Sequence, residues 1–301
     1  MPNPDLSNVR ALIADDRAEV RTLLTERLRA IGVDQIDTSE HVLMGEGALQ
    51  AGAGWEPHHL DMAQPESLTG LAAMIGVTRR IRLLSNVVIA PLRPAGLLAK
   101  MAATMHALSQ GRYAMGVSVS WHRDEYDALN VPFEKRGRVL DDTLGACRVL
   151  WSEAPATFHS ETVNFENMYC SPRPGPGERI PILLGGEFAP RLVRRVVSVG
   201  DGWLLFGGLG MTMSQRADAI AELKQAWADA GRDPARLELD DDITPVNGDV
   251  ARSLEQVPEL AEAGMTTVRV HLRRFGKSPD PMLPVLEEVV RRFEPYRSIE
   301  V

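Results

Sequence analysis

Lysine is scarce in this sequence, and nearly all of its positive charge comes from arginine. The 301 residues contain 33 lysines and arginines against 41 aspartates and glutamates, which gives a net charge of −8. Nucleic acids and anionic membranes bind proteins through basic faces, so neither is an expected partner. None of the four lysines follows a predicted strand, where the Schiff-base lysine of an aldolase-type barrel would stand. They are Lys100, Lys135, Lys224 and Lys277.

Cysteine and long apolar runs are also scarce. The two cysteines, Cys147 and Cys170, make neither a disulfide framework nor a zinc site. The most apolar stretch, residues 83–92, contains polar residues and a proline and is far too short to cross a bilayer. The first residues do not have the pattern of a signal peptide. We therefore expect a reduced, cytoplasmic protein.

Short β-rich segments alternate with helical patterns along the whole chain. Several of the strands are almost continuously apolar, which is typical of parallel strands buried on both faces. The eight predicted strands are 9–14, 35–39, 81–90, 113–119, 181–184, 202–206, 237–243 and 267–272. The predicted helices are 17–31, 95–108, 138–151, 190–199, 212–230 and 254–263.

Eight repeats of this alternation, with no break in composition, predict an α/β fold of the (β/α)8 TIM-barrel type. We expect one domain over residues 1–301, and a doubly wound open sheet is the alternative. The connection over about 152–180 is long and contains a possible hairpin at 157–158 and 163–165. We interpret it as an insertion that could serve as a binding loop.

In such a barrel, functional side chains lie where the strands end. Glu40 and His41 follow the second strand. An imidazole titrates near neutrality and suits proton transfer, so both residues are candidate catalytic groups. A polar strand end that happens to contain a histidine is the simpler alternative. The third strand ends in apolar residues that could pack against a flat ring, or could simply be a buried strand before a turn.

Glycines mark the ends of the next three strands. Gly116 lies in the fourth strand, Gly185 and Gly186 end the fifth, and Gly207 and Gly208 follow the sixth. Glycine lets a ligand approach the backbone closely. Paired glycines before a helix can also bind phosphate through free amides. An ordinary turn is the alternative for each pair, but two pairs on consecutive strands favour a phosphorylated ligand.

Three other patterns do not support a function. Residues 11–16 look like the opening of a phosphorylation receiver domain, but the acceptor aspartate and later lysine are missing. The segment 58–61 holds two histidines and an aspartate without the spacing of metal ligands, so we expect no metal. The glycines of 45–54 do not follow a strand, which argues against a dinucleotide fingerprint.

An ordered set of segments resembles the luciferase-like monooxygenase superfamily, in its flavin- or coenzyme F420-dependent oxidoreductase branch. The resemblance covers roughly residues 30–210 and continues more loosely beyond them. The matching segments are Ser39-Glu40-His41-Val42, Pro65-Glu66, Thr78-Arg79-Arg80-Ile81-Arg82-Leu83, Pro91-Leu92-Arg93-Pro94, Leu108-Ser109-Gln110-Gly111-Arg112, Lys135-Arg136-Gly137, Ile180-Pro181-Ile182-Leu183-Leu184-Gly185-Gly186 and Gly200-Asp201-Gly202-Trp203.

The resemblance implies a cofactor site. The ring of F420 or FMN is expected on Asn86, Val87 and Val88, where relatives often have a non-proline cis peptide. Residues lining the ring and its phosphate are expected to be Gly116, Ser118, Gly185, Gly186, Gly207 and Gly208. His41 matches a position that relatives use near the reacting face, and Arg93, Trp121 and His122 are candidates for shaping the substrate side.

The resemblance also implies a homodimer formed through the helices after strands two and three. Small residues at Ala99, Ala102 and Ala103 would suit close helix packing. Two departures from the family pattern bear on the site. Ser118 stands where relatives usually have glycine, and the loop after the first strand is short.

The implied activity is redox chemistry on a small organic substrate whose identity stays open. Reduced F420 would pass a hydride to a carbonyl, imine or activated alkene, whereas reduced FMN would support oxygenation. The branch that the chain resembles favours F420. A non-catalytic flavin-binding barrel is a further alternative.

Overall fold

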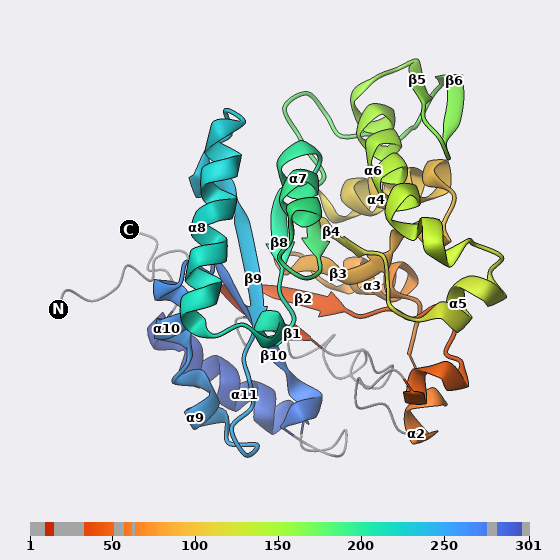
Figure 1. Ribbon diagram of the computed structural model, residues 1–301. Coiled ribbons are helices and arrows are strands. Elements are labelled where there is room, and N and C mark those ends of the chain that lie inside the picture. Colours follow the sequence, from red (N-terminus) through yellow and green to blue (C-terminus); the bar gives the residue numbers. More distant parts are fainter. Residues whose placement is uncertain (1–9, 15–32, 51–56, 62–63, 276–281, 297–301) are drawn as a thin grey trace.

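The computed structural model describes residues 10–14, 33–50, 57–61, 64–275 and 282–296 (Figure 1). Eight parallel strands lie side by side in the order β1-β10-β9-β8-β7-β4-β3-β2, and β1 pairs with both β10 and β2. The first and last residues of each strand lie within two positions of those predicted. They are β1 (Arg10–Ala14), β2 (Gln35–Thr38), β3 (Arg82–Ile89), β4 (Tyr113–Ser118), β7 (Ile182–Gly185), β8 (Gly202–Leu204), β9 (Glu238–Asp242) and β10 (Thr267–His271).

The parallel α/β architecture is therefore as predicted. A complete (β/α)8 alternation also requires the helix expected at 17–31, which lies outside the described residues. The insertion predicted between the helix at 138–151 and the fifth strand contains the antiparallel pair β5 (Ala156–His159) and β6 (Asn164–Met168). In Figure 1 this hairpin lies beside α6, away from the sheet of parallel strands.

Helices cover the outside of the strands. The longer ones are α3 (Ser67–Val77), α4 (Ala95–Ser109), α6 (Arg136–Ser152), α7 (Pro190–Ser198), α8 (Met213–Asp229) and α11 (Met282–Phe293). The shorter ones are α2 (Pro57–Leu60), α5 (Arg123–Ala128), α9 (Val250–Leu254) and α10 (Val257–Glu262). Within the described ranges, no helix is long and apolar enough to cross a membrane.

One expected helix is divided in two, and four helices, α2, α3, α5 and α11, were not predicted. The helix expected over 254–263 is two helices, because Pro258 at the start of α10 lacks the amide needed to continue the preceding turn. Helix α3 was missed because its sequence, SLTGLAAMIGV, has too few polar residues to display a helical period. Helix α11 was also missed.

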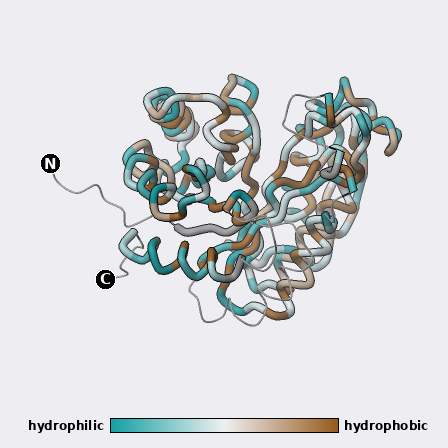
Figure 2. Tube along the Cα trace, turned by 90° about the horizontal axis from the view of Figure 1, so that it is seen from below, coloured by the Kyte–Doolittle hydropathy of each residue, from teal (hydrophilic) through white to brown (hydrophobic). Residues whose placement is uncertain are grey.

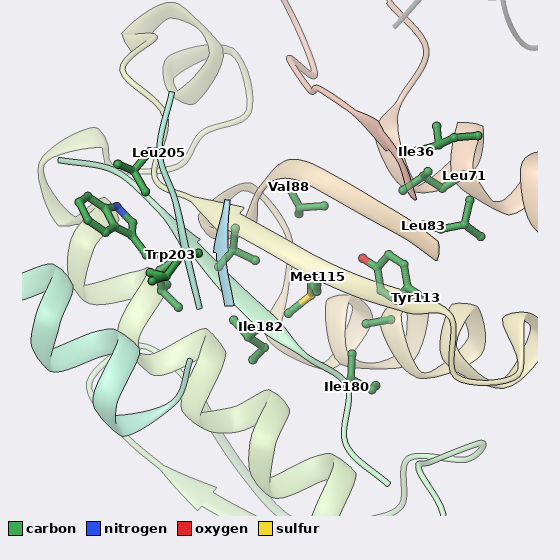
Figure 3. Close-up of a cluster of buried hydrophobic side chains, with 14 of the residues drawn as sticks. Ile36, Leu71, Leu83, Val88, Tyr113, Met115, Ile180, Ile182, Trp203 and Leu205 are labelled. Atoms are coloured by element: carbon green, nitrogen blue, oxygen red, sulfur yellow. The ribbon is translucent and has the colours of Figure 1, made fainter. Parts of the chain in front are cut away.

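The core has two layers. The larger layer lies between strands and helices and includes Leu83, Tyr113, Met115 and Ile182 (Figure 3). A smaller layer made of Leu84, Ala114, Leu183 and Leu204 comes from the opposite faces of β3, β4, β7 and β8. This separation follows from the alternation of side chains along a strand. Along the surrounding helices, hydrophobic and hydrophilic residues alternate (Figure 2).

The small residues of α4 pack inside the chain. Ala99, Ala102 and Ala103 are buried, and the indole nitrogen of Trp151 in α6 donates to the carbonyl of Ala99 at 2.9 Å. This corrects the expectation that these alanines form a face for a second subunit, because α6 already covers it. The opposite face of α4 carries Leu97 and Leu108, which are 53% and 64% exposed.

Candidate active site

Helix α5 binds the backbone of the loop that follows β2. Oε1 of Glu125 accepts hydrogen bonds from the amides of Val42 at 2.5 Å and Leu43 at 3.4 Å. Oδ2 of Asp124 accepts one from the amide of Gly47 at 2.8 Å. Glu125 is fully buried, so these bonds form away from competing water. The start of α5 therefore determines where the β2 loop lies.

The glycines of this loop make the contact possible. A Cβ atom at Gly45 would lie 2.6 Å from Cβ of Asp124, and one at Gly47 would lie 2.7 Å from its Oδ2. Both distances are shorter than real side chains allow. The Gly45-Glu46-Gly47 sequence thus serves the packing of the loop on α5.

His41 lies at the start of the same loop, against Glu125. Its Nδ1 is 3.4 Å from Oε2 of Glu125, and its side chain is 12% exposed. The imidazole meets the rings of Trp121 and His122 edge-on, with centroids 5.5 and 6.0 Å away. A buried carboxylate beside one ring nitrogen orients an imidazole for proton transfer. The group can therefore hold and transfer a proton.

Three predicted site residues, His41, Trp121 and His122, are thus brought together from two loops. Glu125, which joins them, was not predicted as a site residue, although it falls in the region that resembles the family. Trp121 is 41% exposed and borders the site on its open side. Ser118, half-buried, ends β4 opposite Ile89 of β3.

His122 is buried and accepts a hydrogen bond. The amide of Gly45 donates to its Nε2 at 2.9 Å. Burial lowers the pKa of His122 from its ordinary value of 6.5, although Asp124 and Glu125 oppose the change. The folded state therefore favours the neutral ring of His122. As pH falls below 6.5, the unfolded state binds a proton more readily than the folded state, so the free energy of unfolding decreases.

We expect the free energy of unfolding of the wild type to decrease between pH 7.5 and 5.5 by more than that of His122→Gln. A glutamine oxygen can accept the Gly45 amide but does not titrate. Urea unfolding of both proteins at each pH measures the difference. Equal pH dependence in the two proteins would show that His122 has the same pKa in the folded and unfolded states.

Glu40 and Arg93 form an internal ion pair. The Glu40 carboxylate is fully buried. It accepts hydrogen bonds from both Nη atoms of Arg93, at 2.8 and 2.6 Å, and from the amide of Ile89 at 2.9 Å. Arg93 also donates to Glu66 at 2.6 Å, and Glu66 caps α3. Burial raises the pKa of Glu40, and Arg93 opposes this. This geometry corrects two expectations. Both oxygens of Glu40 accept hydrogen bonds from the chain, so Glu40 is not placed to transfer a proton. Arg93 is paired with Glu40 and Glu66, so it is not placed to bind the substrate.

The end of β3 contains the segment expected beneath a cofactor ring. The Asn86–Val87 peptide is cis, as the resemblance implied for this segment. Asn86 donates from its amide nitrogen to Oδ2 of Asp37 at 2.6 Å. Val87 is partly exposed and packs on the inner layer, whereas Val88 is fully buried in the outer core (Figure 3). The Val88 side chain is therefore covered by the outer core, which corrects its assignment as a ring contact.

The glycines of β4 and β7 are required by packing. A Cβ at Gly116 would lie 2.2 Å from the carbonyl oxygen of Ser85, so the absence of a side chain lets β3 approach β4. A Cβ at Gly185 would lie 2.9 Å from the ring of Phe206 and 3.2 Å from Val87. Phe206 is 36% exposed and was not predicted as a site residue.

Each of the two glycine pairs contains one open and one crowded position. A Cβ at Gly186 or at Gly207 would meet no atom within 4 Å, so both backbones are accessible. The amide of Gly208, by contrast, donates to Asp241 at 3.0 Å, and Arg216 pairs with the same carboxylate at 2.8 Å. The expectation that the Gly208 amide is free to bind phosphate is therefore wrong.

The charged residues inside the strands were not predicted. Arg269 of β10 is fully buried and lies 2.7 Å from Oδ1 of Asp242, 3.1 Å from Asp240 and 3.6 Å from Asp37. Burial raises the pKa of Asp37 to about 6, against the opposing charge of Arg269. Among the described residues, no group of three or more histidines, cysteines or carboxylates is arranged to hold a metal ion.

With this geometry in place, comparison with known proteins decides the family. The model of the luciferase-like monooxygenase family matches residues 12–285. The chain belongs to the luciferase-like monooxygenase family. Other members of the family and the structural neighbours of this chain include monooxygenases and other oxidoreductases.

Individual relatives agree with this assignment. An uncharacterized protein of Mycobacterium tuberculosis is 32% identical over 201 residues, which cover 66% of each chain. The match thus spans slightly under two thirds of that relative. Monooxygenase RslO1 from Streptomyces bottropensis superposes with a TM-score of 0.74 at 18% identity, over 95% of this chain and 98% of the other. An F420-dependent secondary alcohol dehydrogenase, solved with an F420–acetone adduct, gives 0.73 at 13% identity, over 95% and 98%. At these identities the two structures show a shared fold.

Proposed function

We propose that this protein binds reduced F420 or FMN at the carboxyl ends of its strands and uses it to reduce or oxygenate a small organic substrate. The observation that carries the proposal is the His41–Glu125 pair, which stands beside strand ends with accessible glycine backbones. F420 is the favoured cofactor, because the branch resemblance points to it and a structural neighbour is F420-dependent.

The residues at the strand ends fit such a cofactor. Val87, Gly185 and Phe206 together offer an apolar surface of the kind on which a flat ring packs. Gly186 and Gly207 leave room for a ligand to approach the backbone. Arg216, the cation beside Gly208, pairs with Asp241, so we assign the phosphate to the open backbone at Gly186 and Gly207.

The roles of the chain follow from this placement. When bound, the reduced ring supplies the hydride or reacts with oxygen. Val87 and Phe206 would position the ring and exclude water from one side of it. His41 would donate a proton to the substrate atom that becomes anionic, and Glu125 would keep the imidazole in place. Trp121 would border the substrate.

Replacing His41 with glutamine is expected to lower kcat by about 100-fold while cofactor binding stays unchanged, because only proton transfer is lost. Turnover should be followed with reduced F420 and with reduced FMN against a ketone, an imine and 2-cyclohexen-1-one. His159→Gln is the matched control, since His159 lies on the β5–β6 hairpin and is 56% exposed. Full turnover in His41→Gln would remove this histidine from the reaction.

FMN-dependent oxygenation is the second candidate, and monooxygenase RslO1 among the structural neighbours favours it. Oxygen uptake with each reduced cofactor separates the two. Oxygen consumption coupled to an oxygenated product with FMN would replace the F420 proposal. Tight cofactor binding without turnover of any substrate would favour a non-catalytic flavin-binding protein.

The resemblance also supports three structural proposals: a complete (β/α)8 barrel, one domain over 1–301, and a homodimer through α3 and α4. Exposed Leu97 and Leu108 on α4 suit such an interface, because isolated large apolar side chains gain by being covered. Light scattering on the purified protein tests the dimer. A monomeric mass at micromolar concentration would contradict it.

A further inference from the structure

A second histidine–carboxylate pair lies at the same ends of the strands. His271 is the last residue of β10, and its Nε2 is 3.1 Å from Oδ1 of Asp242, the last residue of β9. The His271 side chain is 28% exposed, whereas Asp242 is only 3% exposed. A buried carboxylate thus lies beside an imidazole that solvent and a ligand can still reach.

The strand register places this pair close to the proposed cofactor site. His271 is opposite Ala14 of β1, and Ala14 is opposite Asp37 of β2, so His271 and Asp37 stand at the same level two strands apart. His271 follows Arg269 by two residues and therefore projects from the same face of β10. That face points at Asp37, Asp240 and Asp242.

A chain of contacts joins the pair to the segment beneath the ring. Asp242 contacts Arg269, Arg269 lies 3.6 Å from Asp37, and Asp37 accepts from Asn86 at 2.6 Å. The guanidinium of Arg269 also lies 5.6 Å from the ring centroid of Phe206. Residues from β2, β3, β9 and β10 thus face one another around the space in which the proposed cofactor would bind.

The positive charges around Asp242 keep its carboxylate ionised. Although its burial opposes this, Arg269 and His271 lower the pKa of Asp242 to about 2. The carboxylate therefore stays ionised at neutral pH beside the ring. An ionised acceptor at Nε2 fixes the proton on that nitrogen, and Nδ1 becomes the nitrogen that a ligand can meet.

We propose that His271 is a second catalytic acid–base residue of this enzyme, with Asp242 as its positioning residue, and that it exchanges a proton with the bound substrate through Nδ1. This inference rests on the proposed function. In the reduction of an activated alkene, the hydride from the reduced flavin or deazaflavin goes to the β-carbon, and His41 donates a proton to the carbonyl oxygen to give an enol. The Nδ1–H bond of the His271 imidazolium then breaks and a bond from that proton to the α-carbon forms, while the enol proton returns to His41 as the carbonyl re-forms. Water at the exposed edge of the ring then returns a proton to Nδ1.

The test begins with histidine side-chain 15N NMR of the holoprotein, with His271→Gln and His159→Gln used to assign the signals. The neutral His271 ring is expected as the Nε2–H tautomer, and Asp242→Asn should populate the other tautomer. Saturation with oxidised F420 or FMN should shift the His271 signal and leave that of His159 in place. A wild-type His271 in the Nδ1–H form, or one indifferent to a bound cofactor, would overturn the inference.

Kinetics then tests the catalytic role. His271→Gln should bind the cofactor as the wild type does and lower kcat at least about 10-fold with 2-cyclohexen-1-one as the acceptor. Normal kcat in this variant overturns the role of His271 and leaves the proposed function intact. Absence of cofactor binding in the wild type would instead reject the proposed function, and the inference with it.

Discussion

Replacing Arg269 with leucine is expected to reduce the free energy of unfolding by about 3–5 kcal/mol, because it leaves buried carboxylates without their counter-charge. Arg269 is fully buried and is shared by Asp37, Asp240 and Asp242. Its Nη2 also donates to the carbonyl of Leu205 at 2.5 Å, so that acceptor is lost too. Denaturant unfolding followed by circular dichroism measures the change.

The pH dependence of this loss has a definite sign. Burial already raises the pKa of Asp37 to about 6 and that of Asp240 well above 3.8, even beside Arg269. The folded state therefore binds protons that the unfolded state has released, and these two groups cost stability as pH rises through that range. Without Arg269 the cost is larger at high pH, so Arg269→Leu should be more destabilising at pH 8 than at pH 5.

Arg123→Leu is the matched control. Arg123 pairs at 2.7 Å with Glu134, but both side chains are more than half exposed. Exposed pairs contribute little, so no measurable change in unfolding is expected. If Arg269→Leu behaved like this control at both pH values, the buried charges would not depend on Arg269.

Replacing Gly185 with valine is expected to weaken cofactor binding at least about 100-fold, or roughly 3 kcal/mol. The added Cβ would come within 2.9 Å of the Phe206 ring and 3.2 Å of Val87. Phe206 is 36% exposed and has room to move, so it would be driven into the space proposed for the ring. Quenching of cofactor fluorescence measures the change in Kd.

Gly76→Ala is the control for this prediction. Gly76 lies in α3, and a Cβ there would meet no atom within 4 Å. Alanine favours a helix over glycine, so this variant should bind cofactor normally and be slightly more stable. Unchanged binding in Gly185→Val, with the protein folded, would place the ring elsewhere.

Much of the fold could be predicted because strand and helix periods are local. The end of each strand was found to within two residues, and His41, Trp121 and His122 were expected near the site. The contact of His41 with Glu125 joins residues 84 positions apart, and no local pattern encodes such a distance. The role of Glu40 was misjudged for the same reason, since Arg93, its partner, lies 53 positions away.

The charged interior escaped prediction for a different reason. The sequence of β9, ELDDD, contains more carboxylates than a buried strand usually tolerates, and all three aspartates are nonetheless buried. The burial of Asp240 and Asp242 depends on Arg269, whose position is fixed only when β9 and β10 pair, whereas Asp241 pairs with Arg216 of α8. The excess of acid in a predicted strand was therefore a signal that a buried cation had to exist elsewhere.

The sequence could not show which glycines are needed for packing and which are open to a ligand. Gly116, Gly45 and Gly47 are needed because another part of the chain approaches them closely. Gly186 and Gly207 have no such neighbour and stay candidates for ligand contact. Only the three-dimensional surroundings distinguish a glycine that serves packing from one that is open to a ligand.

The most direct test of the central claim is a titration of the purified protein with F420 and with FMN, followed by quenching of cofactor fluorescence. The account predicts saturable binding of at least one of them with one site per chain, tighter for F420, and its loss in Gly185→Val but not in Gly76→Ala. Absence of quenching by either cofactor, with the protein shown to be folded, would contradict the account.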